Sequence, residues 1–197
     1  MSLHAVHHLQ QLIKDTALSC GRKPESITLL AVSKQHNVAA IKEVAALGIK
    51  NFAESYYQEA EEKIKQLHDL NLDWHFIGPI QSNKTRGIAT HFSWVHSITR
   101  ARIAERLNRY RGPMLPPLNV CIHVNVVDEA TKSGISCDQA KELAHILRQY
   151  PNLKLRGLMT IPPAQHTAEE QYAVFIKLQQ LLAALNKELG LTMDTLS

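Results

Sequence analysis

The sequence alternates between short apolar, β-branched runs and longer segments with helical spacing, and this alternation limits the folds the chain can adopt. The predicted strands are 27–33, 51–55, 73–78, 94–98, 119–126 and 153–161, and a further strand begins at Asp194. The predicted helices are 3–20, 38–47, 56–70, 101–109, 137–150 and 167–189. Buried, non-alternating strands separated by helices are typical of a parallel sheet covered by helices.

Two architectures fit this alternation: an open doubly wound sheet and a (β/α)8 TIM barrel. A doubly wound nucleotide-binding fold usually has a glycine-rich turn after its first strand, whereas the turn here reads SKQHN at 33–37. The absence of glycine favours the barrel. Six strands and the start of a seventh are too few for a complete barrel, which typically needs about 250 residues. We therefore expect a single barrel domain, 1–197, that is incomplete at its C-terminal end.

Composition excludes several classes of protein. The net charge is only +4 and the basic residues are spread along the chain, which argues against a nucleic-acid binder. The chain shows neither a membrane-spanning apolar run nor a signal peptide, and its three cysteines form no C-x-x-C pair, so we expect a cytoplasmic protein with reduced thiols. His4, His7 and His8 share a helix face, but no carboxylate or cysteine joins them, so we expect no metal site.

Lys34 stands at the exit of the first predicted strand, in LLAVSKQHN at 29–37. Function in a barrel gathers at the carboxyl ends of the strands. There we expect the ammonium of Lys34 to be partly desolvated, which would lower its pKa and provide a neutral amine able to form a Schiff base. The alternative is a lysine whose stem packs on the barrel rim while its charge reaches water.

A second cluster is WHFIGPIQSNKTRG at 74–87. His75 lies within its predicted strand, where a polar side chain is costly to bury without a partner. After the strand, Gly78 and Pro79 force a turn, and polar side chains follow. They form either the wall of a ligand pocket or an ordinary strand-to-helix turn in which Ser82 or Asn83 caps the helix.

Two further clusters lie near predicted strand ends. In HVNVVDEATKSGIS at 123–136, Asp128, Glu129 and Lys132 could form an ion-paired loop. Lys132 is a second candidate amine, although its polar neighbours favour a solvated lysine. In LRGLMTIPP at 155–163, Gly157 allows close approach of a ligand or of another backbone. Met159, in the same segment, has the ordinary interpretation of core packing.

Together these clusters resemble the YggS/PROSC family of pyridoxal 5′-phosphate (PLP) homeostasis proteins. The matching segments are LLAVSK (29–34), ESYYQEA (54–60), WHFIGPIQSNK (74–84), VNVVDEATKSGI (124–135), GLMTIP (157–162) and DTLS (194–197). They occur in the family's order and at its spacing along nearly the whole chain.

The resemblance implies a barrel like the N-terminal domain of alanine racemase, with PLP as cofactor. It implies that Lys34 holds PLP as an internal aldimine at the barrel mouth. Ser55, His75, Asn83 and Met159 are the other predicted cofactor-binding residues. The family binds and delivers PLP without robust catalysis, so we predict no catalytic residue and expect PLP-dependent apoenzymes as partners.

The chain departs from the family pattern in two places. The family usually reads FGENY where residues 52–56 read FAESY, so Ala53 replaces a glycine and Ser55 an asparagine. After Ser197 the family continues with segments that supply a phosphate cradle and an arginine facing the pyridine nitrogen. We therefore expect a truncated product or fragment that binds PLP weakly. It would either pair its open sheet edge with another chain or expose apolar surface there, whereas the complete protein would be monomeric.

Two rival functions remain. The first is a racemase-like or other Schiff-base enzyme that uses Lys34 on the same barrel. Racemisation, however, needs acid–base groups on both faces of the substrate carbon, and in true racemases a second domain supplies one of them. The second rival is a binding module in which Lys34 has only a structural role.

Overall fold

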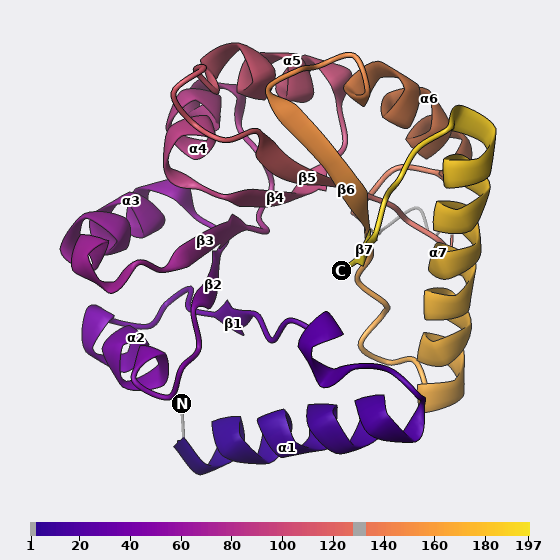
Figure 1. Cartoon of the computed structure of the whole chain (residues 1–197). Coiled ribbons are helices and arrows are strands. Elements are labelled where there is room, and N and C mark those ends of the chain that lie inside the picture. Colours follow the sequence, from indigo (N-terminus) through magenta and orange to yellow (C-terminus); the bar gives the residue numbers. More distant parts are fainter. Residues whose placement is uncertain (1–2, 128–132) are drawn as a thin grey trace. The chain divides into compact units, whose positions relative to one another are not determined.

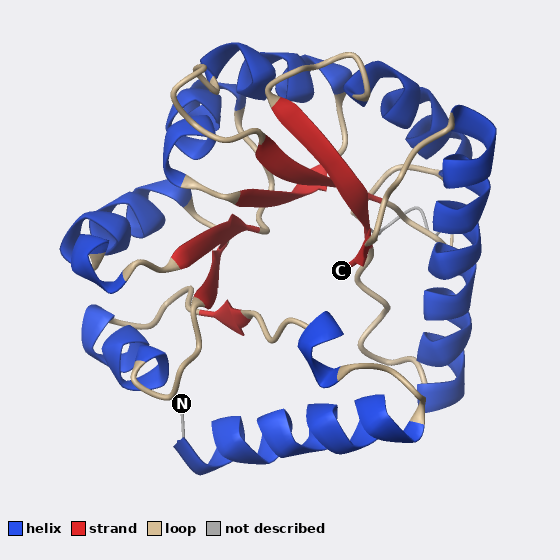
Figure 2. Ribbon diagram, viewed as in Figure 1, coloured by secondary structure: helices blue, strands red, loops and turns tan. Residues whose placement is uncertain are grey.

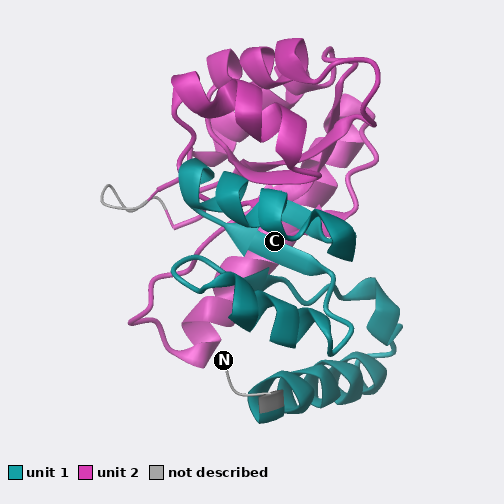
Figure 3. Ribbon diagram, turned by 90° about the vertical axis from the view of Figure 1, so that its left-hand side faces the viewer, with its two compact units in different colours: residues 1–75 teal, residues 76–197 magenta. Residues whose placement is uncertain are grey.

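The computed structural model describes residues 3–127 and 133–197, which fall into two compact units (Figure 3). Unit 1 is Met1–His75 and unit 2 is Phe76–Ser197. The loop predicted around Asp128, Glu129 and Lys132 lies outside the described residues.

Unit 1 alternates short parallel strands with helices (Figure 1). Its elements are α1 (Leu3–Ser19), η1 (Pro24–Ser26), β1 (Ala31–Val32), α2 (Val38–Ala45), β2 (Asn51–Glu54), α3 (Tyr57–Gln66), η2 (His68–Leu70) and β3 (Asp73–Phe76), whose last residue crosses the unit boundary. The strand order is β1-β2-β3, and β1 runs parallel to β2. The Asn37 side chain caps α2 by accepting a hydrogen bond from the Ala40 N–H. Gly48, with a φ of 85°, turns the chain after that helix, as its sequence predicts.

Unit 2 continues the same alternation. Its elements are η3 (Ser82–Lys84), α4 (Thr85–His91), β4 (Trp94–Ile98), α5 (Ala101–Tyr110), β5 (Leu118–His123), α6 (Cys137–Leu147), β6 (Leu153–Met159), α7 (Ala168–Leu189) and β7 (Thr195–Leu196). The strands are parallel in the order β4-β5-β6-β7, and helices lie along one face of them (Figure 2). Capping boxes begin α6 at Ser136 and α7 at Thr167. Within the described residues, no helix is long and apolar enough to cross a lipid bilayer.

Gly157 on β6 lies opposite Thr195 on β7. A Cβ atom at this position would stand 1.7 Å from the Thr195 carbonyl oxygen. The close approach of another backbone, one of the two explanations offered for this glycine, is therefore confirmed. Any side chain at residue 157 would force β7 to move.

The sequence prediction was wrong for two elements. The first strand, predicted at 27–33, is reduced to Ala31–Val32, because only these two residues pair with β2. Helix α4 was not among the predicted helices. It has only seven residues with Gly87 among them, and neither Ser82 nor Asn83 caps it: Lys84 is the N-cap residue and makes no side-chain cap bond. The capping alternative for those two polar residues is thus excluded.

The last strand, β7, is short as predicted, whereas β1 is shorter than predicted. β7 has two residues, and Leu196 on it is 47% exposed, while Val32 on β1 is 38% exposed. These two exposed apolar side chains agree with one of the two expectations for the sheet edges, and pairing of an edge with another chain stays a prediction.

Candidate functional site

Lys34 lies in the turn directly after β1, and backbone hydrogen bonds fix this turn on both sides of it. The Ser33 N–H donates to the Ala53 carbonyl (2.9 Å), and the His36 N–H donates to the Ser33 carbonyl (3.0 Å). Gln35 has a φ of 63°, in the left-handed region that side chains other than glycine seldom adopt. Within residues 3–127 and 133–197, the Lys34 ammonium makes no hydrogen bond or ion pair.

The Lys34 side chain is exposed, which corrects the expectation that its ammonium is partly desolvated. The short first strand agrees with this exposure: β1 ends at Val32, which is itself 38% exposed, and Lys34 lies beyond it in the turn. Within the described residues the amine of Lys34 has no partner, so it is available to react.

A buried ion-pair cluster lies directly beneath this turn. The Lys63 ammonium on α3 donates to the Ser33 carbonyl oxygen (2.7 Å) and to Oε1 of Glu54 at the end of β2 (2.7 Å). The Ser33 hydroxyl donates to the same Glu54 oxygen (2.7 Å). The side chains of Lys63 and Glu54 are 7% and 0% exposed. Charges buried this deeply require partners of opposite charge and further hydrogen bonds, and the cluster supplies both.

Glu59 extends the cluster to the other side of Lys34. Its Oε1 accepts a hydrogen bond from the Lys63 ammonium (2.6 Å) and another from the Gln35 N–H (2.6 Å). Burial raises the pKa of Glu59, but the hydrogen bonds from Lys63 and Gln35 outweigh it and hold the pKa below its ordinary value. Glu59 is thus an anion that ties the residue after Lys34 to α3.

Glu54 keeps one acceptor unused. Its second carboxylate oxygen, Oε2, is buried and has no hydrogen-bond partner among the described residues. Ser55 follows it and is half-buried. Ser55 and Lys34 follow the carboxyl ends of two paired strands, as the sequence predicts.

His75 has a partner that accounts for its burial. On β3, its Nε2 lies 3.1 Å from the Asn51 amide oxygen at the start of β2. Asn51 is the first residue of β2 and Glu54 is the last, and each residue of a strand adds about 3.3 Å. The contact of His75 therefore lies at the end of β2 away from Glu54. This contact supports a structural role for His75, and its predicted part in cofactor binding remains a proposal.

The other two predicted cofactor residues belong to unit 2. Asn83 lies in η3 and is exposed, and within the described part of the chain its amide makes no hydrogen bond. Met159 ends β6 and is 4% exposed, opposite His123 in the register with β5. Burial of Met159 agrees with core packing, while the unpaired amide of Asn83 agrees with a ligand-facing role.

Unit 2 also buries histidines within its strands. His96 on β4 lies with Nδ1 2.8 Å from the Ser197 hydroxyl and stacks on Trp94, and burial lowers its pKa to about 4. Burial also lowers the pKa of His123. Both rings are therefore neutral at pH 7.

Sequence reasoning missed Glu59 and Lys63, because the charges of α3 read as a solvated face. A signal was present. Ala60, Lys63 and Leu67 follow the three- and four-residue spacing of a buried helix stripe, and all three are buried. A lysine on an apolar stripe predicts a buried partner, which here is Glu54.

Parallel strands that follow one another in chain order, with helices between them, are the pattern of a (β/α) barrel. The family model described as "Alanine racemase, N-terminal domain" matches residues 7–197, and the chain belongs to this family. Its fold is therefore the (β/α)8 barrel of this type, with β1 to β7 described as seven of the strands, and the doubly wound alternative is excluded.

Particular relatives refine this assignment to PLP homeostasis proteins. The chain is 52% identical over 185 residues to a pyridoxal phosphate homeostasis protein of Pseudomonas aeruginosa, covering 94% of this chain and 79% of the relative. It is 45% identical to the protein of that name from Escherichia coli K12, covering 98% and 84%.

Solved structures agree. PipY of Synechococcus elongatus, solved with PLP bound, superposes with a TM-score of 0.81 at 34% identity, covering 93% of this chain and 86% of PipY. An alanine racemase of Corynebacterium glutamicum superposes with a TM-score of 0.70 at 18% identity, covering 98% of this chain but 53% of the racemase. The racemase likeness shows the fold alone.

Proposed function

We propose that this chain binds PLP covalently through Lys34 and serves PLP homeostasis without robust catalysis of its own. The observation that supports the site is the Lys34 amine, which is exposed and has no partner among the described residues although the backbone on both sides of it is fixed. The PLP homeostasis proteins at 45–52% identity and PipY with PLP bound support the ligand.

The residues present fit this cofactor. PLP supplies an aldehyde, which condenses with a primary amine and releases water, and Lys34 provides an amine that no carboxylate of the described residues engages. The ammonium must lose a proton before it can attack, and exposure to solvent provides a route for that proton. In the proposal Ser55, which follows the strand paired with β1, offers a hydrogen bond to the cofactor. The cofactor contacts of His75, Asn83 and Met159 stay predictions.

The proposed lack of robust catalysis rests on the lengths of the relatives. The chain covers 79–84% of the homeostasis proteins but only 53% of the C. glutamicum racemase, so the homeostasis proteins are much shorter than that enzyme. We propose PLP-dependent apoenzymes as recipients of the cofactor. To test this, the chain loaded with PLP is added to a PLP-dependent apoenzyme in place of free PLP. Release of the cofactor should restore the activity of that enzyme.

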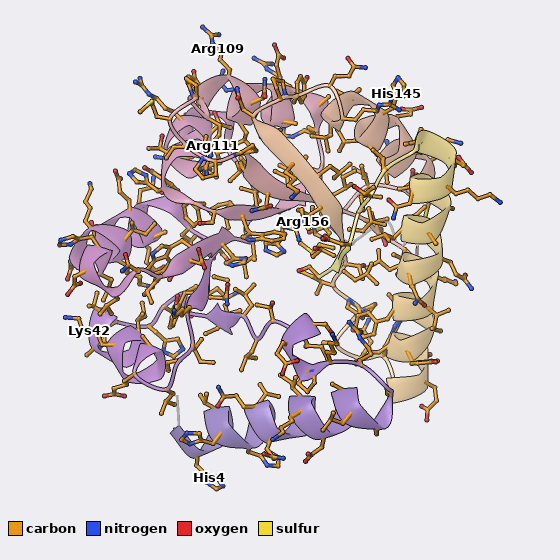
Figure 4. All side chains as sticks on the ribbon, in the orientation of Figure 1. His4, Lys42, Arg109, Arg111, His145 and Arg156 are labelled. Carbon is orange, nitrogen blue, oxygen red and sulfur yellow. The ribbon has the colours of Figure 1, made fainter. Side chains whose placement is uncertain are left out.

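Reductive trapping tests the site directly. The chain is incubated with PLP, reduced with borohydride and digested, and the pyridoxyl label is located by mass spectrometry. We expect the label on Lys34 and its loss in Lys34→Ala. Lys42→Ala, which removes another exposed lysine of unit 1 (Figure 4), should label like the unchanged chain. Equal labelling of several lysines without preference for Lys34 would refute the site.

The enzyme alternative has its own test. A racemase-like protein loaded with PLP should exchange the α-proton of amino acids for deuterium at ordinary enzyme rates, on the order of 1 per second or faster. We expect exchange far below that rate. Turnover at or above it would replace the homeostasis proposal with the enzyme.

A further inference from the structure

We propose that Glu59, acting with Lys63, is a positioning residue for Lys34. The two residues together fix the backbone of the turn on both sides of Lys34, so that the amine is presented at one place. This inference rests on the proposed attachment of PLP to Lys34.

The contacts of the cluster converge on the two neighbours of Lys34. The residue before it, Ser33, is bound through its carbonyl by Lys63 and through its hydroxyl by Glu54. The residue after it, Gln35, is bound through its N–H by Glu59. Since Glu59 and Lys63 are bound to each other at 2.6 Å, both anchors belong to one connected set of hydrogen bonds.

The conformation of Gln35 shows why an anchor is needed. A residue other than glycine at a φ of 63° is strained and keeps that conformation only when its surroundings hold it there. The bond from the Gln35 N–H to the Glu59 carboxylate is charge-assisted and short, the strong kind of hydrogen bond. Without it we expect the turn to sample other conformations, and the Lys34 amine to move with them.

A purely stabilising role would not require this arrangement. Glu54 alone already gives the Lys63 ammonium a buried counter-charge at 2.7 Å. Glu59, whose side chain is 30% exposed, adds no burial of comparable depth, yet one of its oxygens reaches both the ammonium and the turn. The added contact is explained by what it holds, which is the backbone next to the reactive lysine.

The same helix offers a matched control. Glu61 and Lys65 form an ion pair at the same four-residue spacing as Glu59 and Lys63, and the Glu61 side chain is 33% exposed. Lys65, however, is 66% exposed, so this pair lies on the solvent side of α3. Glu61→Leu therefore repeats the chemical change of Glu59→Leu, at similar exposure, in an ion pair that lies away from the buried cluster.

The test measures the rate of labelling at Lys34 by borohydride trapping at timed intervals, with labelling at Lys42 followed in the same digests. We expect Glu59→Leu to slow labelling of Lys34 about tenfold, the equivalent of one hydrogen bond of ~1.4 kcal/mol. Labelling at Lys42 should not change. Glu59→Gln keeps an amide oxygen for the Gln35 N–H, so it should slow the reaction less. Glu61→Leu should stay within about twofold of the unchanged chain, since surface pairs contribute little.

A second readout separates positioning from stability. Circular dichroism of the bound PLP chromophore reports how uniformly it is held, and we expect its amplitude per bound PLP to fall in Glu59→Leu but not in Glu61→Leu. If Glu59→Leu does not fold, Glu59→Gln is compared with Glu61→Gln in the same way. Equal rates and equal dichroism for the matched pair would overturn the positioning role and leave the proposed function standing. No label on Lys34 in the unchanged chain would overturn both.

Discussion

Each unit holds a cation against carboxylates, but at opposite ends of its strands. In unit 1 the Lys63 ammonium, on a side chain only 7% exposed, meets Glu54 at the carboxyl end of β2. In unit 2 Arg156 (Figure 4), on β6 and 24% exposed, pairs with Asp194 just before β7 and lies over the ring of Trp94, the first residue of β4.

The difference follows the division of labour in barrels of this type. Residues at the carboxyl ends of the strands serve function, and those at the amino ends serve stability. A fully buried ion pair is an expensive way to stabilise a fold, because desolvation offsets much of its attraction. Its presence beside Lys34 is better explained by what it positions. The Arg156 cluster is half in water, costs less to form and needs no such explanation.

The largest expected effect comes from removing the buried cation. Lys63→Met leaves Glu54 buried with an uncompensated charge, so we expect a loss of about 3–5 kcal/mol in the free energy of unfolding. Urea unfolding followed by circular dichroism measures it. The double variant Glu54→Gln with Lys63→Met removes both charges and should recover part of the loss. A cost of Lys63→Met below about 1 kcal/mol, the range of a surface pair, would erase the contrast between the two clusters.

The second prediction concerns the pH dependence of stability, to which the buried His96 of unit 2 contributes. The folded-state pKa of His96, lowered by burial to about 4, lies below the unfolded value of about 6.5, so the unfolded chain binds the extra proton first. The stabilisation that the neutral His96 ring contributes is complete above pH 6.5 and is lost as the pH falls toward 4. The slope is at most about 1.4 kcal/mol per pH unit, or roughly 3 kcal/mol in total.

Urea unfolding at intervals across this pH range tests the assignment. His96→Asn should flatten the slope, while His123, whose pKa is also lowered by burial, should keep part of it. The carboxylates of Glu59 and Asp194, whose pKa values are lowered, contribute stability that is lost only at lower pH, which separates the two effects. An unchanged slope in His96→Asn would refute the assignment.

The fold could be predicted largely from sequence because strand and helix periodicity are local properties. β4 was predicted with its observed bounds, and Gly157 was recognised as a point of close approach. The short β1 and helix α4 were not predicted correctly, because pairing length and an uncapped helix start depend on neighbours distant in sequence.

The candidate site divides in the same way. Lys34 could be found from its place after an apolar run, since the exit of a strand is visible in sequence. Its exposure could not be foreseen, because it depends on how much of β1 pairs with β2. Lys63 lies 30 residues from the Ser33 carbonyl that it binds, and only the fold brings them together.

The smallest expected effect is at the half-exposed cluster of unit 2. Arg156 donates to both Asp194 oxygens at 2.8 Å and to the Asn119 side chain at 3.1 Å, and its guanidinium lies 4.8 Å from the centre of the Trp94 ring. Asp194 is 58% exposed, so solvent screens the pair, and we expect Arg156→Met to cost only about 1 kcal/mol in urea unfolding. Arg156→Lys keeps the charge but loses the two parallel hydrogen bonds to Asp194. Its free energy of unfolding should lie between those of Arg156→Met and the unchanged chain. Because this cluster lies at the amino ends of its strands, neither variant should change the rate of labelling at Lys34. A rate reduced as much as in Glu59→Leu would mean that the amino ends also control the lysine, and the division between the two clusters would fail.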